Sequence, residues 1–582
     1  MSAASAVSAA EPGARPAVHA PWGETLSRRR IIFVLISIIL GMLLSALDQT
    51  VVGTAMPRII ADPAINGMAH YAWVATAYLL ASAVSMPIWG KLSDAYGRKR
   101  FFMVGMVLFV LGSALCGQSH SMLELITFRA LQGLGAGAML PINQAILGDI
   151  FPPTQRARWA GVLMSVYGVA TILGPLLGGW ITDNIGWRWT FYVNLPVGIV
   201  ALAFAAWALP GHVKVRKHVI DWLGTAFLVA AAVPLLLAFS WAGSEYAWSS
   251  PVIIGLFVFS AVMWGVFVRR EMRAEEPVLN PRLFRNSIFT VSSLASAIQS
   301  AAMFGAIMFL PLFVQGVMGK TATNSGTILM PMMLAAIATS IGGGQLLART
   351  GRYKAVVVFG FAVVTVGAFL LSRMTISTTF GQLAVFMVIM GLGLGIAMST
   401  FTVIVQNQYP THRLGEVSAG LQFFRSLGST VGLAVFGAIL NARFASALAT
   451  SLPAQLKGIA ADPATASQIN NPQVLLSAQA QTHLQQMFGQ FGTGGQKLYS
   501  AFMDAVRHSL ESAIGRVFFL AMSISIVGFV VVLFLKEVPL RRTHSNTVEN
   551  GVSVTLSEAG PAVADVSEEA PAGIAKAGLL EA

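Results

Sequence analysis

The hydrophobic positions of this chain form long stretches, and short polar segments separate them. A helix needs about 20 apolar residues to cross the roughly 30 Å hydrocarbon core of a bilayer. Fourteen stretches have about this length: residues 31–56, 71–89, 101–118, 122–147, 159–183, 188–209, 220–241, 251–268, 288–316, 325–347, 355–372, 382–405, 417–441 and 515–535. The pattern therefore predicts an all-α integral membrane protein with 14 transmembrane helices.

The composition agrees with a membrane protein and argues against other classes. Of the 582 residues, 55% are hydrophobic and 10% are charged, whereas soluble domains carry about 25% charged residues. The single cysteine, Cys116, excludes an internal disulfide framework and a cysteine zinc cluster, and the nine His residues form no metal pattern. No GxxxxGK[ST] loop occurs, which argues against an ATP-driven pump. We expect no metal, no cofactor and no enzymatic activity.

The distribution of basic residues predicts the orientation. The net charge of +13 reflects topology and not nucleic-acid binding, because the basic residues lie in loops between apolar stretches. With the N-terminus inside, 26 of the 37 Lys and Arg residues lie on cytoplasmic segments and 9 on external ones. An even number of spans places both termini in the cytoplasm. We expect a multi-pass plasma-membrane protein of a bacterial inner membrane, with a fungal plasma membrane as the alternative.

Two short sequences occur once in each half of the chain. GKLSDAYGRKR at 90–100 resembles GQLLARTGRYK at 344–354, and PTQR at 153–156 resembles PTHR at 410–413; the offsets are 254 and 257 residues. These matches align spans 1–6 with spans 9–14 and leave spans 7 and 8 as an inserted pair. Many secondary transporters are built from such repeats, because a site between two halves can open to each side in turn. The repeat therefore points to transport.

The repeat divides the chain into five parts. We predict a disordered cytoplasmic N-terminus (1–27), an N-terminal six-helix bundle (28–209), an inserted two-helix hairpin with its linkers (210–286), a C-terminal six-helix bundle (287–540) with an external loop (442–514), and a disordered cytoplasmic tail (541–582). Within the hairpin, Asp221 lies at the cytoplasmic entrance and Glu245 in the external turn, with no ionisable residue between them. A hairpin without buried polar groups can face lipid, so we predict that it packs peripherally.

Five segments in order along the chain carry a family resemblance: LDQTVVGTAMP (47–57), GKLSDAYGRKR (90–100), RALQGLGAGAMLP (129–141), GVATILGPLLGG (168–179) and WRWTFYVNLPVG (187–198). Over residues 30–540 the chain resembles the 14-span drug:proton antiporter branch of the major facilitator superfamily. The resemblance implies a monomeric major facilitator fold that exports amphipathic drugs by alternating access. Its partners would be protons, membrane lipids and a lipophilic or cationic small molecule, and no nucleic acid.

Two alternatives to drug export remain open. The same machine can be dedicated to an endogenous product such as a siderophore, a lipid or a secondary metabolite. A non-transporting membrane scaffold or sensor that uses the external loop is the third class. No residue in the sequence names the ligand.

Asp48 and Arg129 are the candidates for proton coupling. An ionised carboxylate at the centre of a membrane helix costs about 2.5–3.5 kcal/mol even on a lenient scale, and a buried carboxyl group takes up a proton more readily than one in water. Arg129, in span 4, stays protonated and can only tune a carboxylate nearby. The alternatives are a structural carboxylate that caps a helix and an arginine that reaches the membrane boundary. The coupling role is mainly what the resemblance implies.

The loop after span 2 reads as a latch. Gly90 and Gly97 permit a tight turn, and Asp94 can accept hydrogen bonds from the free N–H groups of a helix N-terminus. Arg98 can bridge to Asp149 below span 4. The second copy carries Ala348 in place of the aspartate, so the C-terminal latch is incomplete.

Span 5 contains the glycine-rich motif that the resembled antiporters share. Its small or kinking residues let two helices approach closely, and we predict that it packs against span 13, where glycines recur. The residues are Gly168, Gly174, Pro175, Gly178 and Gly179 in span 5 and Gly428, Gly432 and Gly437 in span 13.

Polar residues inside the spans are candidates for a substrate cavity: Gln132, Asn143, Gln144, Gln299, Gln315, Gln406, Asn407 and Arg425. Abundant Met and Phe in the C-terminal bundle can repack around varied apolar ligands.

Overall fold

The computed structural model describes residues 22–62, 65, 71–211, 221–243, 246–319, 329–452, 485–486, 488 and 495–540. In this part of the chain all regular elements are helical, and 14 helices are long and apolar enough to cross a membrane. The prediction of an all-α fold with 14 spans is therefore confirmed. Residues 1–21, most of the loop between spans 13 and 14, and the tail 541–582 lie outside the described residues.

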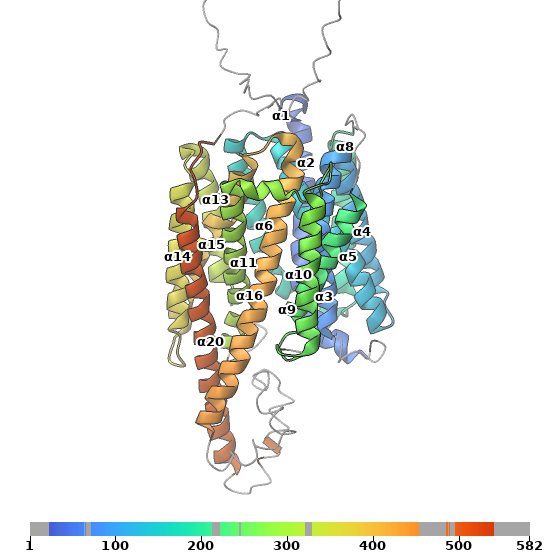
Figure 1. Ribbon diagram of the computed structural model, residues 1–582. Helices are drawn as coiled ribbons and strands as arrows, with labels where there is room; N and C mark the ends of the chain where they lie inside the picture. Colours follow the sequence, from blue (N-terminus) through green and yellow to red (C-terminus); the bar gives the residue numbers. More distant parts are fainter. Residues whose placement is uncertain are drawn as a thin grey trace, which may run out of the picture.

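The first six spans form one bundle (Figure 1). Its elements are α1 (Trp22–Thr25), α2 (Arg28–Ala61), α3 (Tyr71–Tyr96), α4 (Arg98–Gly117), α5 (Met122–Ile150), α6 (Pro153–Asn184), α7 (Trp189–Tyr192) and α8 (Asn194–Ala208). Ser27 and Ser121 cap α2 and α5, since each hydroxyl accepts a hydrogen bond from a first-turn N–H. Gly97, with a φ of 105°, makes the sharp turn between α3 and α4.

The remaining spans form an inserted hairpin and a second bundle. The hairpin is α9 (Trp222–Trp241) and α10 (Pro251–Glu271), and the second bundle follows the short helix η2 (Pro281–Arg285). Its helices are α11 (Ser287–Gly316), α13 (Met330–Thr350), α14 (Lys354–Ser372), α15 (Phe380–Gln406), the short η4 (Thr411–Arg413), α16 (Leu414–Ser451) and α20 (Gly495–Leu533). The first described helix and the end of α20 lie at the same end of the bundle (Figure 1). We call this the terminal end and the opposite one the loop end.

The hairpin packs at the junction of the two bundles. Helix α9 contacts α3 of the first bundle and α16 of the second, and α10 packs mainly on α9. Figure 1 shows α9 and α10 in front of this junction. One ionisable residue that the sequence reasoning did not consider, Glu271 at the end of α10, is buried beside the N-cap residue Asp221. Among the described residues of the hairpin, the two carboxylates, Asp221 and Glu271, therefore lie together at the terminal end.

Helices α16 and α20 extend beyond the loop end of the bundle (Figure 1). They have 38 and 39 residues, which at 1.5 Å per residue is about 57 Å, or nearly twice the hydrocarbon thickness. Residues 442–451 and 495–514, predicted as parts of an external loop, are therefore helical extensions of the two spans. Arg443 of α16 donates to the hydroxyl of Ser512 in α20 at 3.3 Å, which links the extensions.

The glycine-rich span 5 does not pack against span 13, so that prediction is wrong. Helix α6 packs against α13, the tenth span. A Cβ on Gly161 would lie 2.4 Å from the carbonyl oxygen of Ser340, and one on Gly344 would lie 2.4 Å from that of Ala157. Backbone meets backbone at both points, which only glycine permits. We call this contact the glycine seam.

The glycines of span 13 have a different partner. Gly428 and Gly432 of α16 lie against Ala297 and Ala301 of α11, within the second bundle. Repeat symmetry suggested that the two glycine-rich spans face each other. In the structure each faces a neighbour with its own small residues, because close approach depends on the partner surface as much as on the glycine.

A single added side chain should disrupt the glycine seam. Gly344→Val places a branched side chain against the backbone of Ala157, and we expect a loss of about 1–3 kcal/mol in stability. The measurement is the thermal unfolding temperature of the purified protein in detergent. Gly342→Val is the matched control, because a Cβ at Gly342 on the same helix meets no atom within 4 Å. Equal unfolding temperatures for the two variants would contradict the seam.

Cysteine scanning tests the peripheral position of the hairpin. Cysteines placed singly through residues 222–240 and 252–267 should react slowly with a membrane-impermeant maleimide, because these positions face lipid or neighbouring helices. Ser249→Cys, in the exposed turn, should react quickly and serves as the positive control. Rapid labelling along a whole helical face would show that the hairpin lines an aqueous path.

Candidate functional site

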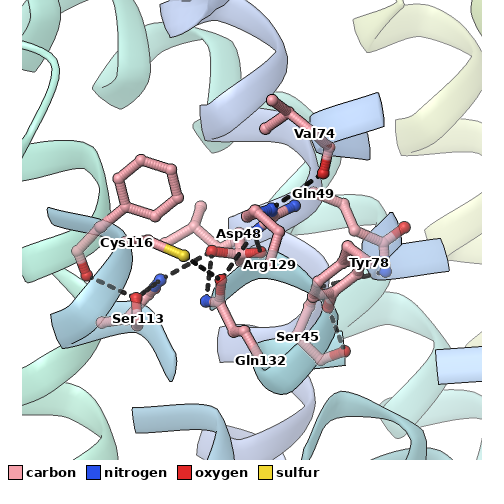
Figure 2. A network of polar contacts seen from close by, with 12 residues as sticks. Ser45, Asp48, Gln49, Val74, Tyr78, Ser113, Cys116, Arg129 and Gln132 are labelled. Carbon is pink, nitrogen blue, oxygen red and sulfur yellow. Dashed lines mark hydrogen bonds and ion pairs between the residues drawn. The ribbon is translucent and has the colours of Figure 1, made fainter. Parts of the chain in front are cut away.

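A fully buried carboxylate lies at the centre of the first bundle (Figure 2). Asp48 of α2 is 0% exposed, and its Oδ2 lies 2.6 Å from Nη1 of Arg129 in α5. Its Oδ1 accepts hydrogen bonds from Nε2 of Gln132 and from Nδ2 of Asn194, both at 2.9 Å. Both oxygens are thus satisfied by one cation and two amides. We call these four residues the aspartate network.

The guanidinium of Arg129 is held on several sides. Its Nη1 also donates to Oε1 of Gln132 at 2.8 Å, and its Nε donates to the carbonyl of Val74 at 3.3 Å. The ring of Tyr78 lies 4.3 Å from the guanidinium carbon, within cation–π range. A buried ion pair is stable only with such additional hydrogen bonds, and losing one partner leaves an uncompensated charge. The guanidinium of Arg129 is therefore held by its pair with Asp48 together with neutral partners from two other helical positions, Gln132 and Val74.

Two members of this site were missed from the sequence. Asn194, the first residue of α8, also donates to Oγ of Ser113 at 3.0 Å, and Ser113 in turn donates to the carbonyl of Phe191 at 2.8 Å. Asn194 lies in the segment WRWTFYVNLPVG, which we used only as a family signature. Its side-chain amide at the start of a predicted span could have identified Asn194 as a candidate site residue. Through these contacts four helices, α2, α4, α5 and α8, converge on Asp48.

The predicted latch residues lie together at the terminal end. The carboxylate of Asp94 pairs with Arg98, and its two oxygens accept hydrogen bonds from the backbone N–H groups of Gly415 at 2.9 Å and Glu416 at 2.6 Å. These donors are in the first turn of α16, so a side chain of the first bundle caps a helix of the second. Nε of Arg98 lies 3.1 Å from Oδ2 of Asp149.

Close packing accompanies this cap. A Cβ on Gly90 would lie 2.4 Å from Cβ of Ala419 and 2.6 Å from the carbonyl oxygen of Gly415. Nη2 of Arg98 also donates to the carbonyl of Thr411 at 3.4 Å. The latch is therefore a contact between the two bundles, and it closes the terminal end of the boundary between them.

A second group of polar contacts crosses the same boundary. Nη1 of Arg156 in α6 donates to Oε1 of Gln406 in α15 at 3.1 Å. Nε2 of Gln406 donates to the carbonyl of Gln144 at 3.1 Å and to Oγ of Ser418 at 2.7 Å. Helices α5 and α6 of the first bundle and α15 and α16 of the second thus meet at Gln406. Arg156 was not among the predicted site residues, although it lies in the repeated PTQR segment.

The other predicted cavity residues are spread over the molecule. Asn143 donates to the carbonyl of Ile38 within the first bundle, and Gln299 donates to that of Leu394 within the second. Asn407 donates to the carbonyl of Pro539, in the segment that follows α20. Gln315 is half-buried near the loop end of α11. These four residues do not form one site.

The glycines of the span-5 motif contact two different helices. Gly168 faces Ile337 of α13, where a Cβ would lie 2.8 Å from Cγ1, whereas Gly174 faces Thr50 of α2. The carbonyl of Gly178 accepts a hydrogen bond from the hydroxyl of Thr182, and a Cβ on Gly179 would meet no atom within 4 Å. The motif therefore serves packing both within the first bundle and between the bundles.

Comparisons with known proteins match this chain to a family of membrane transporters. The family model described as Major Facilitator Superfamily matches residues 38–433. Multidrug transporter protein MdtP of Bacillus subtilis (strain 168) is 39% identical over 510 residues, covering 86% of this chain and 92% of that protein. Multidrug resistance protein 3 of the same organism is 36% identical over 515 residues, covering 88% and 97%.

A solved structure shares the fold. The crystal structure of the human organic anion transporter MFSD10 (TETRAN) covers 85% of this chain and 99% of that chain, with a TM-score of 0.51 and 14% sequence identity.

Weakening the latch should loosen the terminal end. Asp94→Asn removes the charge that caps α16 and pairs with Arg98, so the boundary between the bundles should open more often. A cysteine at Thr402, buried in α15, should then react several-fold faster with a water-soluble maleimide, as expected from the loss of about 1–3 kcal/mol per charged hydrogen bond. Asp504→Asn, at an exposed carboxylate of α20, is the control. An unchanged labelling rate in Asp94→Asn would reduce this loop to a topology signal.

Proposed function

This chain belongs to the major facilitator superfamily, and we propose that it exports amphipathic, lipophilic small molecules in exchange for protons by alternating access. Its multidrug-transporting relatives support the substrate class. The observation that carries proton exchange is the aspartate network, because the ion pair between Asp48 and Arg129 is the one fully buried carboxylate–cation pair in the middle of the described spans.

Protonation of Asp48 changes the packing of the first bundle. As a carboxylate, Asp48 neutralises Arg129 and accepts from Gln132 and Asn194. As a neutral acid it leaves the guanidinium without a counter-charge in a low-dielectric environment, so α2, α5 and α8 favour a different arrangement. Proton uptake on one side and release on the other therefore bias the protein between two conformations. Arg129 remains charged throughout and is available to pair with Asp48 again after the proton leaves.

The latch supplies the gate. We assign the terminal end to the cytoplasm, as the distribution of basic residues predicts, with both termini cytoplasmic in a bacterial inner membrane. In this assignment the contacts of Asp94 and Arg98 with α16 close the cytoplasmic side. The glycine seam between α6 and α13 lets the two bundles rock without losing contact. Opening the latch would expose the boundary to the cytoplasm, where lipophilic substrate enters.

Met and Phe residues support a broad substrate range. The apolar cluster of the second bundle contains Met303, Met332 and Phe436 among its buried residues, with Phe304 and Met330 partly buried around it. Unbranched methionine side chains and aromatic rings adapt to ligands of different shape. The activity is thus vectorial transport in which no covalent bond of the substrate changes.

Replacement of Asp48 tests the proposal. Asp48→Asn keeps the shape and removes the titratable group, so proton-driven efflux of a lipophilic dye from everted membrane vesicles should fall to the background of vesicles without the protein. Downhill exchange of dye should persist, since it needs no proton. Asp183→Asn, at a carboxylate that is 65% exposed, should leave efflux unchanged. Full activity of Asp48→Asn at equal expression would remove this residue from the coupling mechanism.

A further inference from the structure

Arg425 is a buried cation without a counter-ion among the described residues. It lies in α16, about 16 Å along the helix from Leu414, and is 8% exposed. Its Nη2 donates to the carbonyl of Met398 in α15 at 3.1 Å, and its Nη1 has no hydrogen-bond partner. A guanidinium remains protonated in a protein. An unpaired charge inside a membrane protein is unfavourable and usually marks a functional site.

Other buried arginines in the described part of the chain are paired or satisfied. Arg129 pairs with Asp48, and Arg98 pairs with Asp94 and Asp149. No such ion pair involves Arg425 among the described residues, whose carboxylates all lie beyond 4 Å from its nitrogens. If this position only had to fill buried space, an apolar residue would do so at a lower cost in free energy. The free nitrogen is therefore available to a group that the described part of the chain does not supply.

Other buried polar groups of α15 and α5 at this boundary also lack hydrogen-bond partners among the described residues. The hydroxyls of Ser399 and Thr402 and the side-chain amide of Gln144 have no hydrogen-bond partner. Ser399 and Thr402 lie seven and four residues before Gln406, so a helix places all three on one face of α15. Gln406 contacts the first bundle, so this face is turned toward the boundary between the bundles.

Helix α16 presents a matching face to the same boundary. Ser418, Gln422 and Arg425 follow at spacings of four and three residues, which is again one helical face. Ser418 bonds to Gln406 at the terminal end, and Arg425 bonds to Met398 two turns deeper. The two polar faces therefore run antiparallel into the membrane, and the unpartnered groups lie on the deeper side of the closed contacts.

Two arginines at this boundary, Arg156 and Arg425, form no ion pair with a described carboxylate. Arg156 lies at the terminal end of the boundary and donates hydrogen bonds only to neutral oxygens, namely those of Gln406, Gly148 and Phe151. Asp149 lies close enough to act electrostatically on Arg156, whereas Arg425 has no described carboxylate beside it. A cationic ligand would be repelled here, whereas an anionic oxygen group would be attracted and would find hydroxyl and amide donors beside it.

We propose that Arg425, with Ser399, Thr402 and Gln144, binds the carboxylate of amphipathic anionic substrates. This inference rests on the proposed export function and narrows its substrate class. The cationic substrates that the family resemblance implies are not what this boundary favours. The apolar part of such a substrate would lie against the Met and Phe side chains of the second bundle, and its carboxylate would form a charge-assisted pair with Nη1 of Arg425.

Binding of a matched pair of probes tests this site. 11-(Dansylamino)undecanoate carries a carboxylate, and its methyl ester is the same molecule without the charge; both fluoresce more strongly in apolar sites. The full chain in nanodiscs should bind the carboxylate about tenfold or more tightly than the ester, the range expected for one charge-assisted hydrogen-bond pair. Empty nanodiscs correct for partition into lipid.

Variants test whether Arg425 causes the preference for the carboxylate probe. Arg425→Gln should reduce the ratio of carboxylate to ester affinity to about one while leaving ester affinity unchanged, which also shows that the variant is folded. Arg425→Lys keeps the charge and should retain part of the preference. Arg443→Gln, on the exposed extension of α16, should behave as the wild type. A wild-type ratio near one, or an undiminished ratio in Arg425→Gln, would overturn the proposal.

Failure of the export function is recognised separately. If the protein does not export, vesicles will accumulate neither probe under a proton gradient, whatever the binding ratio. If the ester is exported but the carboxylate has no advantage in binding, export stands and the anion site is rejected.

Discussion

The buried ion pair between Asp48 and Arg129 is the constraint on which the first bundle depends. Leaving either charge alone in a low-dielectric interior would be unfavourable, and the pair joins α2 and α5 through a 2.6 Å contact. Gln132 and Asn194 satisfy the second carboxylate oxygen and bring α8 to the same point. In the mechanism that we propose, a proton on Asp48 removes this attraction and favours another arrangement of α2, α5 and α8. The pair is therefore the contact of the first bundle on which the proposed exchange of protons acts.

The contacts between the two bundles are of a different kind. The glycine seam between α6 and α13 joins backbone to backbone and involves no charge. At the terminal end, the latch and Gln406 add hydrogen bonds that a small rotation can break, such as those from the first turn of α16 to Asp94. In the alternating access that we propose, the uncharged seam keeps the two bundles in contact while the polar contacts at the terminal end break and re-form.

The two bundles differ in their buried charge although the sequence repeat relates them. The first holds a neutral pair, and its latch carries Asp94, whereas the second copy of the loop has Ala348 at that place. The second bundle holds Arg425, which has one backbone acceptor and a free nitrogen. This asymmetry suits the division of labour that we propose, with proton coupling in the first bundle and recognition of an anionic substrate at the boundary with the second.

The sequence by itself determined the fourteen spans, the repeat and the proximity of Arg129 to Gln132. These depend on local properties, since bilayer thickness dictates span length and helical spacing places residues three apart on one face. Only the tertiary structure decided that Asn194 bonds to Asp48, 146 residues away, that span 5 packs on span 10, and that Arg425 lacks a counter-ion among the described residues. Such partners depend on which helix surfaces meet. Hydropathy cannot predict this, because every span is apolar for one reason, namely that it crosses the bilayer.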